Sequence, residues 1–495
     1  MEKIFKINNK DNVAVALKDL SQGDTFEIDR HKVILKDSIP NGHKVALKDI
    51  EEGEHIIKYG YSIGHATQKI TSGQWVHVHN INTNLLGIDE YKFNKDNNFD
   101  AFEQRGLTFK GYIREDGSVG IRNELWIIPT IGCINGIAEQ ILNKFKAIAD
   151  ISKIDALEVF KHSFGCSQLG QDELHTRTIL QNIAKHPNAG GVLVLGLGCE
   201  NNYVEAFKKT LGQYNEKRIR FLVAQEVKDE ISEGMDILQE LYENMLLDIR
   251  REVPISELKV GLKCGGSDGL SGITANPLLG RFSDFLVSQG GTTVLTEVPE
   301  MFGAETMLMN RCVSVEIFNK AVSLINDFKE YFLENNQPVY ENPSQGNKAG
   351  GLSTLEDKSL GCIQKAGTAP VTDVLEYGGV IAKKGLNLLS APGNDLVATT
   401  ALGAAGCQLV LFTTGRGTPF GSFVPTMKIS TNSQIYRLKK HWIDFNAGGL
   451  IEGQSMEVLL EEFIQYIIRV ASGEFVNNEK NGFREITIFK TGVTV

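Results

Sequence analysis

The sequence predicts a multidomain protein, with a small all-β domain followed by two α/β domains with largely parallel sheets. A chain of 495 residues exceeds the usual size of one domain, so two to four domains are expected. Residues 1–92 carry repeated turns between short alternating stretches, whereas 105–495 alternates apolar strand-like runs with helical patterns. A polar segment without periodicity, 93–104, separates the two patterns as a linker.

The N-terminal domain is predicted from an internal repeat. Three similar stretches follow one another: KDLSQGDTF (18–26), KDIEEGEHI (48–56) and QKITSGQWV (68–76). Each has a glycine at the matching place, Gly23, Gly53 and Gly73, which suits a turn with left-handed backbone. Apolar residues alternate around these turns, as in a half-buried strand. We therefore expect a compact module of short strands.

The two α/β domains are predicted from strands that alternate with helices. The first series has strands at 125–129, 157–161, 192–197 and 220–224, and helices at 137–148, 172–186, 203–211 and 229–247. The second has strands at 260–263, 293–296, 386–389, 409–412 and 486–489, and a long helix at 456–471. Nearly continuous apolar strands between helices are typical of parallel sheets. The segment REVPISE (251–257) divides the domains into 105–250 and 251–495.

Composition narrows the function classes. The net charge is −10, which argues against binding nucleic acid through basic patches. No run approaches the ~18 apolar residues of a membrane span, and MEKIFKINNKDN lacks the core of a signal peptide. Seven scattered cysteines in such a chain indicate reduced thiols and a cytoplasmic location. The oligomeric state is left open, a homodimer included.

Unusual residues follow the predicted strands, where parallel sheets bind ligands. These residues are His162 and Cys166 in KHSFGCSQLG, Cys199, Glu200 and Asn201 in GLGCENN, Cys264, Ser267 and Asp268 in CGGSDGLSG, and Arg416 in TTGRGTPFG. Singly, each has an ordinary structural interpretation, since a lone cysteine is usually buried packing and Gly-Cys-Glu can be a helix cap. Their recurrence at several strand ends is the more specific signal.

Cofactor motifs leave one alternative open. No phosphate-binding loop or dinucleotide fingerprint occurs, so no nucleotide cofactor is expected. The cysteines lack CxxC spacing, which argues against a structural zinc site. An iron–sulfur cluster held by Cys166, Cys199 and Cys362 stays an alternative, because thiolates from separate loops can bind iron.

The stretch QWVHVHN (74–80) holds two of the ten histidines. If Trp75–His79 is a strand, His77 and His79 lie on one face and both imidazoles can reach one ion. An exposed polar face gives the same alternation, so this stretch alone leaves both interpretations open.

Together the motifs resemble one family, the altronate/galactarate dehydratases, over nearly the whole chain. KYGYSIGHATQKITSGQWVHVHN resembles the SAF (β-clip) domain of that family. The remaining motifs resemble its dehydratase region: GYIREDGSVGIRNELWIIPT, HSFGCSQLG, LGLGCENN, CGGSDGLSGITANP, TEVPEMFGAE, ENPSQGNKAGG, LEDKSLGC and TTGRGTPFGSFVPTMKIST. GLGCENN, TEVPEMFGAE and KHWIDFNAG favour altronate over galactarate as the substrate.

The resemblance implies a hydro-lyase that converts D-altronate to 2-dehydro-3-deoxy-D-gluconate in hexuronate catabolism. It also implies iron(II) as the cofactor, with manganese(II) as a substitute. Alternatives are a related lyase acting on galactarate or a sulfonated hydroxy acid, and a non-catalytic sugar-acid-binding protein. The expected partner is the small sugar-acid substrate, with neither nucleic acid nor membrane.

Roles then follow from residue type, because removal of the C2 proton creates an enediolate that a divalent cation stabilises. His77 and His79 are the hypothetical metal ligands. His162 is the first choice for acid–base catalysis, because its ordinary pKa is near neutrality. The remaining candidates are Cys166 and Glu200 as further ligands or base, Arg122 and Arg416 for the substrate carboxylate, and Asn201, Ser267 and Asp268 for other substrate contacts.

Overall fold

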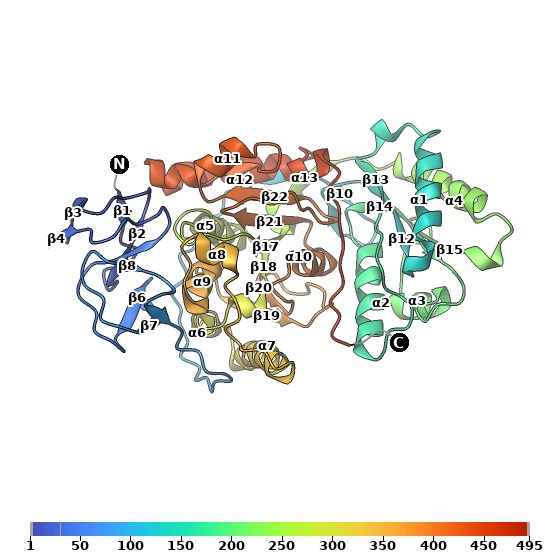
Figure 1. Ribbon diagram of the computed structural model, residues 1–495. Coiled ribbons are helices and arrows are strands. Elements are labelled where there is room, and N and C mark those ends of the chain that lie inside the picture. The colour runs from blue at the N-terminus through green and yellow to red at the C-terminus, as the bar shows by residue number, and fades with distance from the viewer. Residues whose placement is uncertain (1–2, 30, 493–495) are drawn as a thin grey trace.

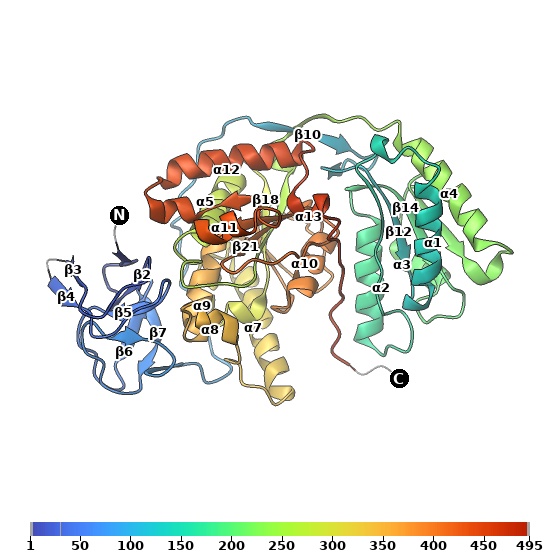
Figure 2. The same cartoon turned by 45° about the horizontal axis from the view of Figure 1, so that its top comes forward.

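A computed structural model describes residues 3–29 and 31–492 (Figure 1). The chain forms a small β module, a four-stranded α/β domain and a larger seven-stranded α/β domain. The larger domain, built from the C-terminal part of the chain, lies between the other two (Figures 1 and 2). The multidomain fold class predicted from the sequence is therefore confirmed. Within the described residues, no helix is long and apolar enough to cross a membrane.

The N-terminal module consists of short antiparallel strands. One sheet has the order β1-β2-β5-β8, from Ile4–Phe5, Val13–Ala16, Lys44–Ala46 and Trp75–Val76. The others pair β3 (Thr25–Ile28) with β4 (His31–Ile34), and β6 (His55–Lys58) and β9 (Ile81–Asn82) with β7 (Tyr61–Ala66). The three repeat glycines have φ of 87°, 80° and 87°, as predicted. A Cβ on Gly73 would lie 2.0 Å from the Ile34 carbonyl oxygen, so this turn requires glycine.

One prediction for this module is wrong. Strand β8 ends at Val76, and residues 77–80 form a turn instead of continuing to His79. The Asn80 side chain causes this change, because its Oδ1 accepts from the backbone N–H of His77 at 2.9 Å. Its backbone N–H donates to the His77 carbonyl, also at 2.9 Å. His77 and His79 therefore do not share one face of a strand.

The second domain has a parallel sheet in the order β13-β12-β14-β15. Its strands are β12 (Glu124–Pro129), β13 (Ala156–Val159), β14 (Ala189–Gly196) and β15 (Ile219–Val223). Its helices are α1 (Asn135–Lys146), α2 (Gln171–Ala184), α3 (Val204–Leu211) and α4 (Glu230–Met245). All eight elements were predicted within a few residues. Beside them β10 (Thr108–Ile113) pairs with β11 (Val119–Gly120) and β16 (Arg251–Pro254), so the predicted boundary begins with a strand.

The C-terminal domain contains a seven-stranded parallel sheet in the order β19-β20-β18-β17-β21-β22-β23. The strands are Val371–Leu375, Gly385–Leu389, Thr292–Leu295, Lys259–Cys264, Leu409–Thr414, Thr426–Ser430 and Phe445–Asn446, in that order. Its helices include α5 (Ala275–Ser288), α6 (Glu305–Met309), α7 (Val315–Glu334), α8 (Gln345–Ala349), α9 (Leu355–Cys362), α10 (Asp395–Ala404), α11 (Ser433–Leu438), α12 (Met456–Ala471) and α13 (Asn477–Lys480). The predicted helix at 456–471 is confirmed residue for residue.

The predicted strand at 486–489 is wrong. This segment is extended but belongs to none of the sheets in the described part of the chain. Ile486 and Ile488 are buried in an apolar cluster to which both α/β domains contribute. The segment runs between those domains toward the C-terminus, where Asp172 of α2 accepts the backbone N–H groups of Thr491 and Gly492 at 2.9 and 2.8 Å. The alternation of apolar and polar residues in 486–489 thus reflects packing between the two α/β domains and not a strand of a sheet.

The N-terminal module is packed firmly against the C-terminal domain. Ile56, Ile63 and Ile81 of the module belong to the same buried cluster as Leu355 and Leu360 of α9. The predicted linker, 93–104, has no helix or strand and packs three phenylalanines against that cluster. A shared apolar core fixes the orientation of the module, so the loops at this boundary form one defined surface.

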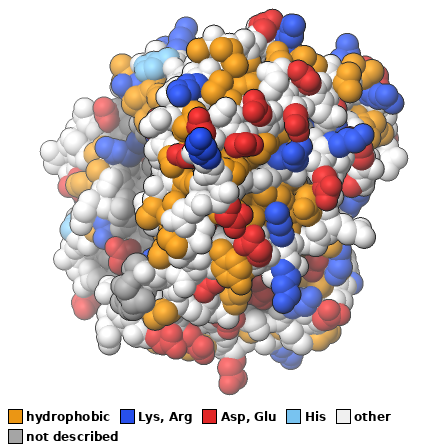
Figure 3. Space-filling view, turned by 90° about the vertical axis from the view of Figure 1, so that its right-hand side faces the viewer, with side chains coloured by type: hydrophobic (Ala, Val, Ile, Leu, Met, Phe, Trp, Pro, Cys, Tyr) orange, Lys and Arg blue, Asp and Glu red, His pale blue; other side chains and the backbone are white. Residues whose placement is uncertain are grey.

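The outer face of the second domain carries positive and negative side chains interspersed among neutral ones (Figure 3). Such mixing is typical of a solvated surface and differs from the basic stripe that nucleic acid requires.

A candidate active site at the carboxyl end of the seven-stranded sheet

The N-terminal module meets the loops at the carboxyl end of the seven-stranded sheet. The contact is made by backbone, because a Cβ on Gly269 would lie 1.8 Å from the Gly42 carbonyl oxygen. A Cβ on Gly351 would lie 2.3 Å from the same oxygen. These glycines follow β17 and α8, in the motifs CGGSDGLSG and ENPSQGNKAGG. Close backbone approach brings side chains of the module within reach of the loop residues.

A buried ionic cluster joins the N-terminal module to the C-terminal domain. Lys44 and Lys58 of the module donate to the two oxygens of Asp357, at 2.7 and 2.9 Å, and all three side chains are buried. Lys44 also donates to the Gly351 carbonyl at 2.7 Å. Both ammonium groups hold the pKa of Asp357 below its usual range, although burial opposes this. Burial lowers the pKa of Lys44 to about 8, and the charge of Lys58 adds to the decrease. The Asp357 carboxylate is thus the shared counter-ion of both lysines.

A second charged cluster lies where β17 and β18 end. Lys263 pairs with Glu297, and its Nζ lies 2.8 Å from Asp395 Oδ1. Lys365 pairs with Glu297 at 2.9 Å. Glu297 has a left-handed backbone, φ 69°, which is costly outside glycine and is held here by the two lysines. Such strain at a strand end is typical of functional sites.

Glu300 connects this cluster to two thiols. Lys358 Nζ lies 2.7 Å from Glu300 Oε1, and the thiols of Cys264 and Cys362 each donate to Glu300 Oε2 at 3.2 Å. The Lys358 charge lowers the pKa of Glu300 to about 2, against the effect of burial. Lys365 Nζ donates to Cys264 Sγ at 2.9 Å. Ammonium groups, carboxylate and thiols thus converge at one strand end, where they can move protons and stabilise anions.

Helix α8 brings three of the predicted substrate-binding residues to this edge. Asn347 binds Lys358 Nζ through Oδ1 at 3.3 Å and the Ser267 carbonyl through Nδ2 at 2.9 Å. Arg416 is exposed, and its Nη1 donates to the Gly346 carbonyl at 3.3 Å. Asp268 is half-buried, and its carboxylate accepts from Thr431 Oγ1 at 2.9 Å, so it holds loops together.

The predicted metal ligands lie on the module beside this edge. His77 is stacked on the Trp75 ring with centroids 5.3 Å apart, and the ring of His79 is tilted against the same indole at 5.3 Å. Burial lowers the pKa of His77 to about 3, so its imidazole is neutral, as a metal ligand must be. Its Nδ1 is buried without a hydrogen-bond partner.

The partnerless Nδ1 of His77 is one free donor for an ion, whereas His43, the third imidazole in contact with this ring cluster, is occupied. His43 lies 4.8 Å from the His77 ring, but its Nδ1 accepts from Trp75 Nε1 and its Nε2 faces the Ala349 carbonyl at 3.3 Å. Within the described residues, one group of three or more His, Cys, Asp or Glu side chains has its donor atoms close enough to share an ion, namely Cys264, Glu300 and Cys362. An ion at His77 and His79 would have to complete its coordination with water or substrate.

The other predicted residues lie at the carboxyl end of the four-stranded sheet, in the second domain. His162 is buried, with Nε2 donating to the Pro129 carbonyl at 2.7 Å and Nδ1 accepting from the Phe164 backbone at 3.1 Å. Glu200 caps its own turn through the backbone N–H groups of Leu197 and Gly198 at 3.0 and 2.6 Å. Asn201 accepts from the backbone N–H of Ser167 at 2.9 Å, next to the exposed Cys166.

Arg122 has a structural environment. It is fully buried, and its guanidinium is paired with Glu479 at 2.7 Å and donates to the carbonyls of Val470 and Glu474 at 2.9 Å each. These contacts join the second domain to the C-terminal domain and leave its guanidinium no path to a substrate.

The cysteines of the alternative iron–sulfur cluster do not come together. Cys166 and Cys199 are exposed in the second domain, whereas Cys362 is buried in the C-terminal domain with its Sγ 3.4 Å from Cys264 Sγ. The structure therefore assigns them to two separate places.

Sequence reasoning missed most of the charged residues at this edge. Glu297 and Glu300 lie in TEVPEMFGAE, and Asp357 and Lys358 lie in LEDKSLGC. These two motifs indicate the family but do not by themselves single out the four residues as site residues. One physical signal was available, since Lys263 lies in the fully buried part of strand β17, among Val260, Gly261, Leu262 and Cys264. A lysine inside a buried strand needs a partner, and the partner marks the site.

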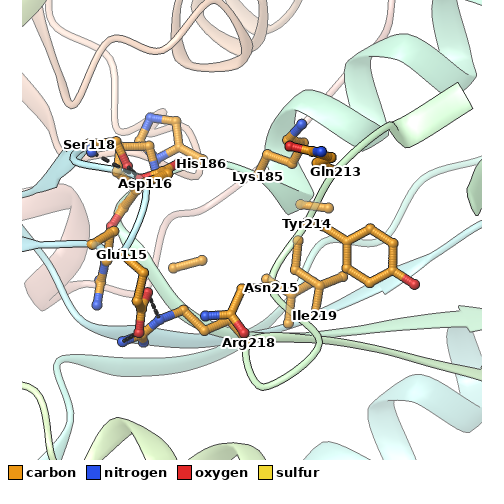
Figure 4. Close-up of a pocket in the computed structure, with 15 residues that line it drawn as sticks. Glu115, Asp116, Ser118, Lys185, His186, Gln213, Tyr214, Asn215, Arg218 and Ile219 are labelled. Atoms are coloured by element: carbon orange, nitrogen blue, oxygen red, sulfur yellow. Dashed lines mark hydrogen bonds and ion pairs between the residues drawn. The ribbon is translucent and has the colours of Figure 1, made fainter.

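A cavity of about 400 Å³ lies away from this edge, at the amino ends of β14 and β15 (Figure 4). Its arginines are already paired, Arg114 with Asp248 at 3.0 Å and Arg218 with Glu115 at 2.7 Å. Parallel sheets bind ligands at the opposite ends of their strands. We therefore place the candidate site at the seven-stranded sheet.

Comparison with known protein families covers most of the chain. Residues 2–84 match "Altronate/galactarate dehydratase SAF domain", and 111–246 match "D-galactarate dehydratase/Altronate hydrolase, second domain". Residues 255–494 match "D-galactarate/Altronate dehydratase, C-terminal". The three matches correspond to the three bodies of the fold.

Relatives align over nearly their whole length. An altronate dehydratase of Bacillus subtilis (strain 168) is 58% identical over 100% of both chains. An altronate dehydratase of Escherichia coli (strain K12) is 56% identical over 99% of both chains. A galactarate dehydratase (L-threo-forming) of the same organism is 34% identical, over 95% of this chain and 93% of the relative.

Proposed function

The chain belongs to the altronate/galactarate dehydratase family, and from that premise we propose that it is a D-altronate dehydratase. This hydro-lyase removes water from D-altronate and forms 2-dehydro-3-deoxy-D-gluconate, in hexuronate catabolism. The observation that carries the proposal is the full-length identity of 58% and 56% with two altronate dehydratases, against 34% with a galactarate dehydratase.

The reaction requires an active site that stabilises negative charge on the substrate and supplies a proton to the leaving hydroxyl. A base must accept the C2 proton, whose loss places charge on the substrate carboxylate, and the C3 hydroxyl needs a proton as it leaves. Arg416 is exposed beside α8 and offers a guanidinium to the carboxylate. Lys358 keeps its proton, because the Glu300 charge raises its pKa above the ordinary value despite burial. We assign Lys358 as the proton donor to the departing hydroxyl.

We also propose iron(II), or manganese(II) in its place, as a cofactor held by His77 and His79. The partnerless Nδ1 of His77 and the neutral state of this imidazole support the assignment. When bound, the ion would act as a Lewis acid toward the substrate carboxylate and a neighbouring hydroxyl. The seven free thiols support a cytoplasmic location.

Product formation tests the substrate assignment. Full-length protein, purified without oxygen and supplied with Fe²⁺, is incubated with D-altronate, galactarate and sulfolactate in parallel. We expect a kcat/KM for D-altronate at least about tenfold above that for galactarate, which is a difference of ~1.4 kcal/mol in transition-state binding. Equal or faster turnover of galactarate would favour that related lyase. No 2-oxo acid from any of the three would favour the sugar-acid-binding protein.

Replacement of the histidines tests the iron assignment. His77→Ala/His79→Ala is expected to bind less iron and to lose turnover. His65→Ala is the control, because His65 is a half-exposed histidine of the same module whose Nδ1 lies 2.9 Å from Asn84 Oδ1. Full iron content and full turnover in the double variant would overturn the assignment.

A further inference from the structure

Cys264, Glu300 and Cys362 hold three donor atoms close together in the interior. The two sulfurs are 3.4 Å apart, and each lies 3.2 Å from the same oxygen, Glu300 Oε2. All three residues are buried. They come from three separate segments, the end of β17, the turn after β18 and the end of α9. The fold therefore brings together donors that are 36 and 62 residues apart in sequence.

The triangle formed by Cys264 Sγ, Cys362 Sγ and Glu300 Oε2 has the dimensions of a metal site. A point equidistant from its three corners lies about 1.9 Å from each of them. An ion slightly above the plane would reach the usual bond lengths of ~2.3 Å to sulfur and ~2.0–2.2 Å to a carboxylate oxygen. No large movement of the three side chains is needed.

The charge around the triangle allows two thiol protons to be exchanged for one divalent ion. Lys263, Lys358 and Lys365 contribute three positive charges, and Glu297, Glu300 and Asp395 contribute three negative charges. The cluster is balanced while both thiols keep their protons. A divalent cation with two thiolates leaves that balance unchanged, and metal binding commonly releases thiol protons in this way.

Both thiols already lie within hydrogen-bond distance of the oxygen that would be the third ligand. A bound ion would therefore replace two hydrogen bonds with three coordinate bonds. Lys365 Nζ, 2.9 Å from Cys264 Sγ, would donate to the resulting thiolate and orient it. Hydrogen bonds of this kind to ligating atoms are a common feature of metal sites.

The geometry points to a buried divalent-metal site formed by Cys264, Glu300 and Cys362, distinct from the histidine pair on the N-terminal module. Two thiolates and one carboxylate favour a thiolate-binding ion such as Fe²⁺ or Zn²⁺ over Mg²⁺ or Ca²⁺. The three protein ligands leave a fourth position for water or substrate. The inference rests on the donor set alone and does not require the proposed function.

Cobalt substitution tests the site in the full-length protein. The protein is stripped of metal with a chelator, loaded with Co²⁺ without oxygen, and examined by absorption spectroscopy and metal analysis. A sulfur-to-cobalt charge-transfer band in the near ultraviolet is expected, because such a band requires a thiolate ligand. Cys264→Ser/Cys362→Ser is expected to lose the band and one cobalt ion per chain. Glu300→Gln, which keeps both thiols, is expected to bind Co²⁺ at least about tenfold more weakly, as the loss of ~1.4 kcal/mol implies.

Two controls separate this site from others. Cys407→Ser removes a buried thiol of the same domain that lies outside the triangle, and should keep the band. His77→Ala/His79→Ala should also keep it. Absence of the band in the unmodified protein, or its persistence in Cys264→Ser/Cys362→Ser, would overturn the site. A band without any 2-oxo acid formed from D-altronate would refute the proposed function alone, and turnover without a band would refute the site alone.

Discussion

Lys44 and Asp357 form a fully buried ion pair of 2.7 Å between two bodies of the fold, 313 residues apart in sequence. Because Asp357 also holds Lys58 at 2.9 Å, this one carboxylate is the shared counter-ion of two ammonium groups of the N-terminal module. The pair therefore helps to fix the orientation of the module beside the candidate site.

We predict that Asp357→Asn lowers the free energy of unfolding by about 3–5 kcal/mol, because two buried ammonium groups lose their counter-charge. Lys44→Met should lower the free energy of unfolding by a smaller amount, because it leaves a charge-balanced pair of Lys58 and Asp357. Urea denaturation followed by circular dichroism measures both. Glu51→Gln, which breaks the exposed pair with Lys69, is the control and should change little. Equal losses in Asp357→Asn and Lys44→Met would contradict this account of the charges.

Arg122→Met should lower stability by about 3 kcal/mol, since Glu479 loses its 2.7 Å partner in the interior. The folded fraction should keep the KM for D-altronate of the unmodified enzyme, because Arg122 has no path to the substrate. Denaturation and steady-state kinetics on the same preparation check both statements. A raised KM with unchanged stability would restore Arg122 as a substrate ligand.

Arg416→Ala should raise the KM for D-altronate about tenfold or more, because an exposed guanidinium beside α8 would no longer meet the carboxylate. The matched control is Arg437→Ala, which removes an exposed arginine paired with Glu452 at 3.7 Å on α11. Initial rates over a range of substrate concentrations distinguish the two. An unchanged KM in Arg416→Ala would remove this residue from the proposed site.

Lys358→Met should reduce kcat by about 10²-fold or more, as expected for loss of a general acid. The nearby control is Lys348→Met, since Lys348 is only half-buried, at the end of α8. Circular dichroism must show that both variants are folded. Rates near those of the unmodified enzyme in Lys358→Met would assign the proton transfer to another group.

Stability should decrease with rising pH between about 4 and 6 through Asp444, whose pKa burial raises to about 6. In that interval the folded state binds more protons at this carboxyl than the unfolded state, whose ordinary pKa is about 3.9. The contribution is complete below that value and is lost as pH rises through 6. Asp444→Asn should flatten this part of the stability profile, as measured by urea denaturation at several pH values. An unchanged slope would contradict the raised pKa.

The elements of the fold were largely predictable, because apolar runs report burial locally. The helix at 456–471 and the four strands of the second domain follow from such runs alone. The two wrongly predicted strands have one cause. An alternation of apolar and polar residues does not show which part of the protein the apolar residues pack against. Residues 486–489 alternate because they lie between two domains, and 75–79 stops being a strand because the Asn80 side chain forms a turn.

The candidate site was less predictable, because its contacts join distant segments. Ser267, Asp268 and Arg416 were found through glycine-rich strand ends, which the structure brings to the same edge as α8. His162 and Glu200 carried the same local signal, yet their polar atoms are occupied by nearby backbone groups. Sequence shows that a residue follows a strand, but not whether its side chain is already satisfied.

The segment that carries Thr491 and Gly492 has a consequence for biosynthesis. Asp172 is in the first turn of α2, but the backbone groups it binds come 319 and 320 residues later in the chain. The second domain can acquire its sheet while the chain is still being made, whereas this contact forms only after residues 491 and 492 have been synthesised. Attachment of the two α/β domains through this segment is therefore a late step in folding of the chain.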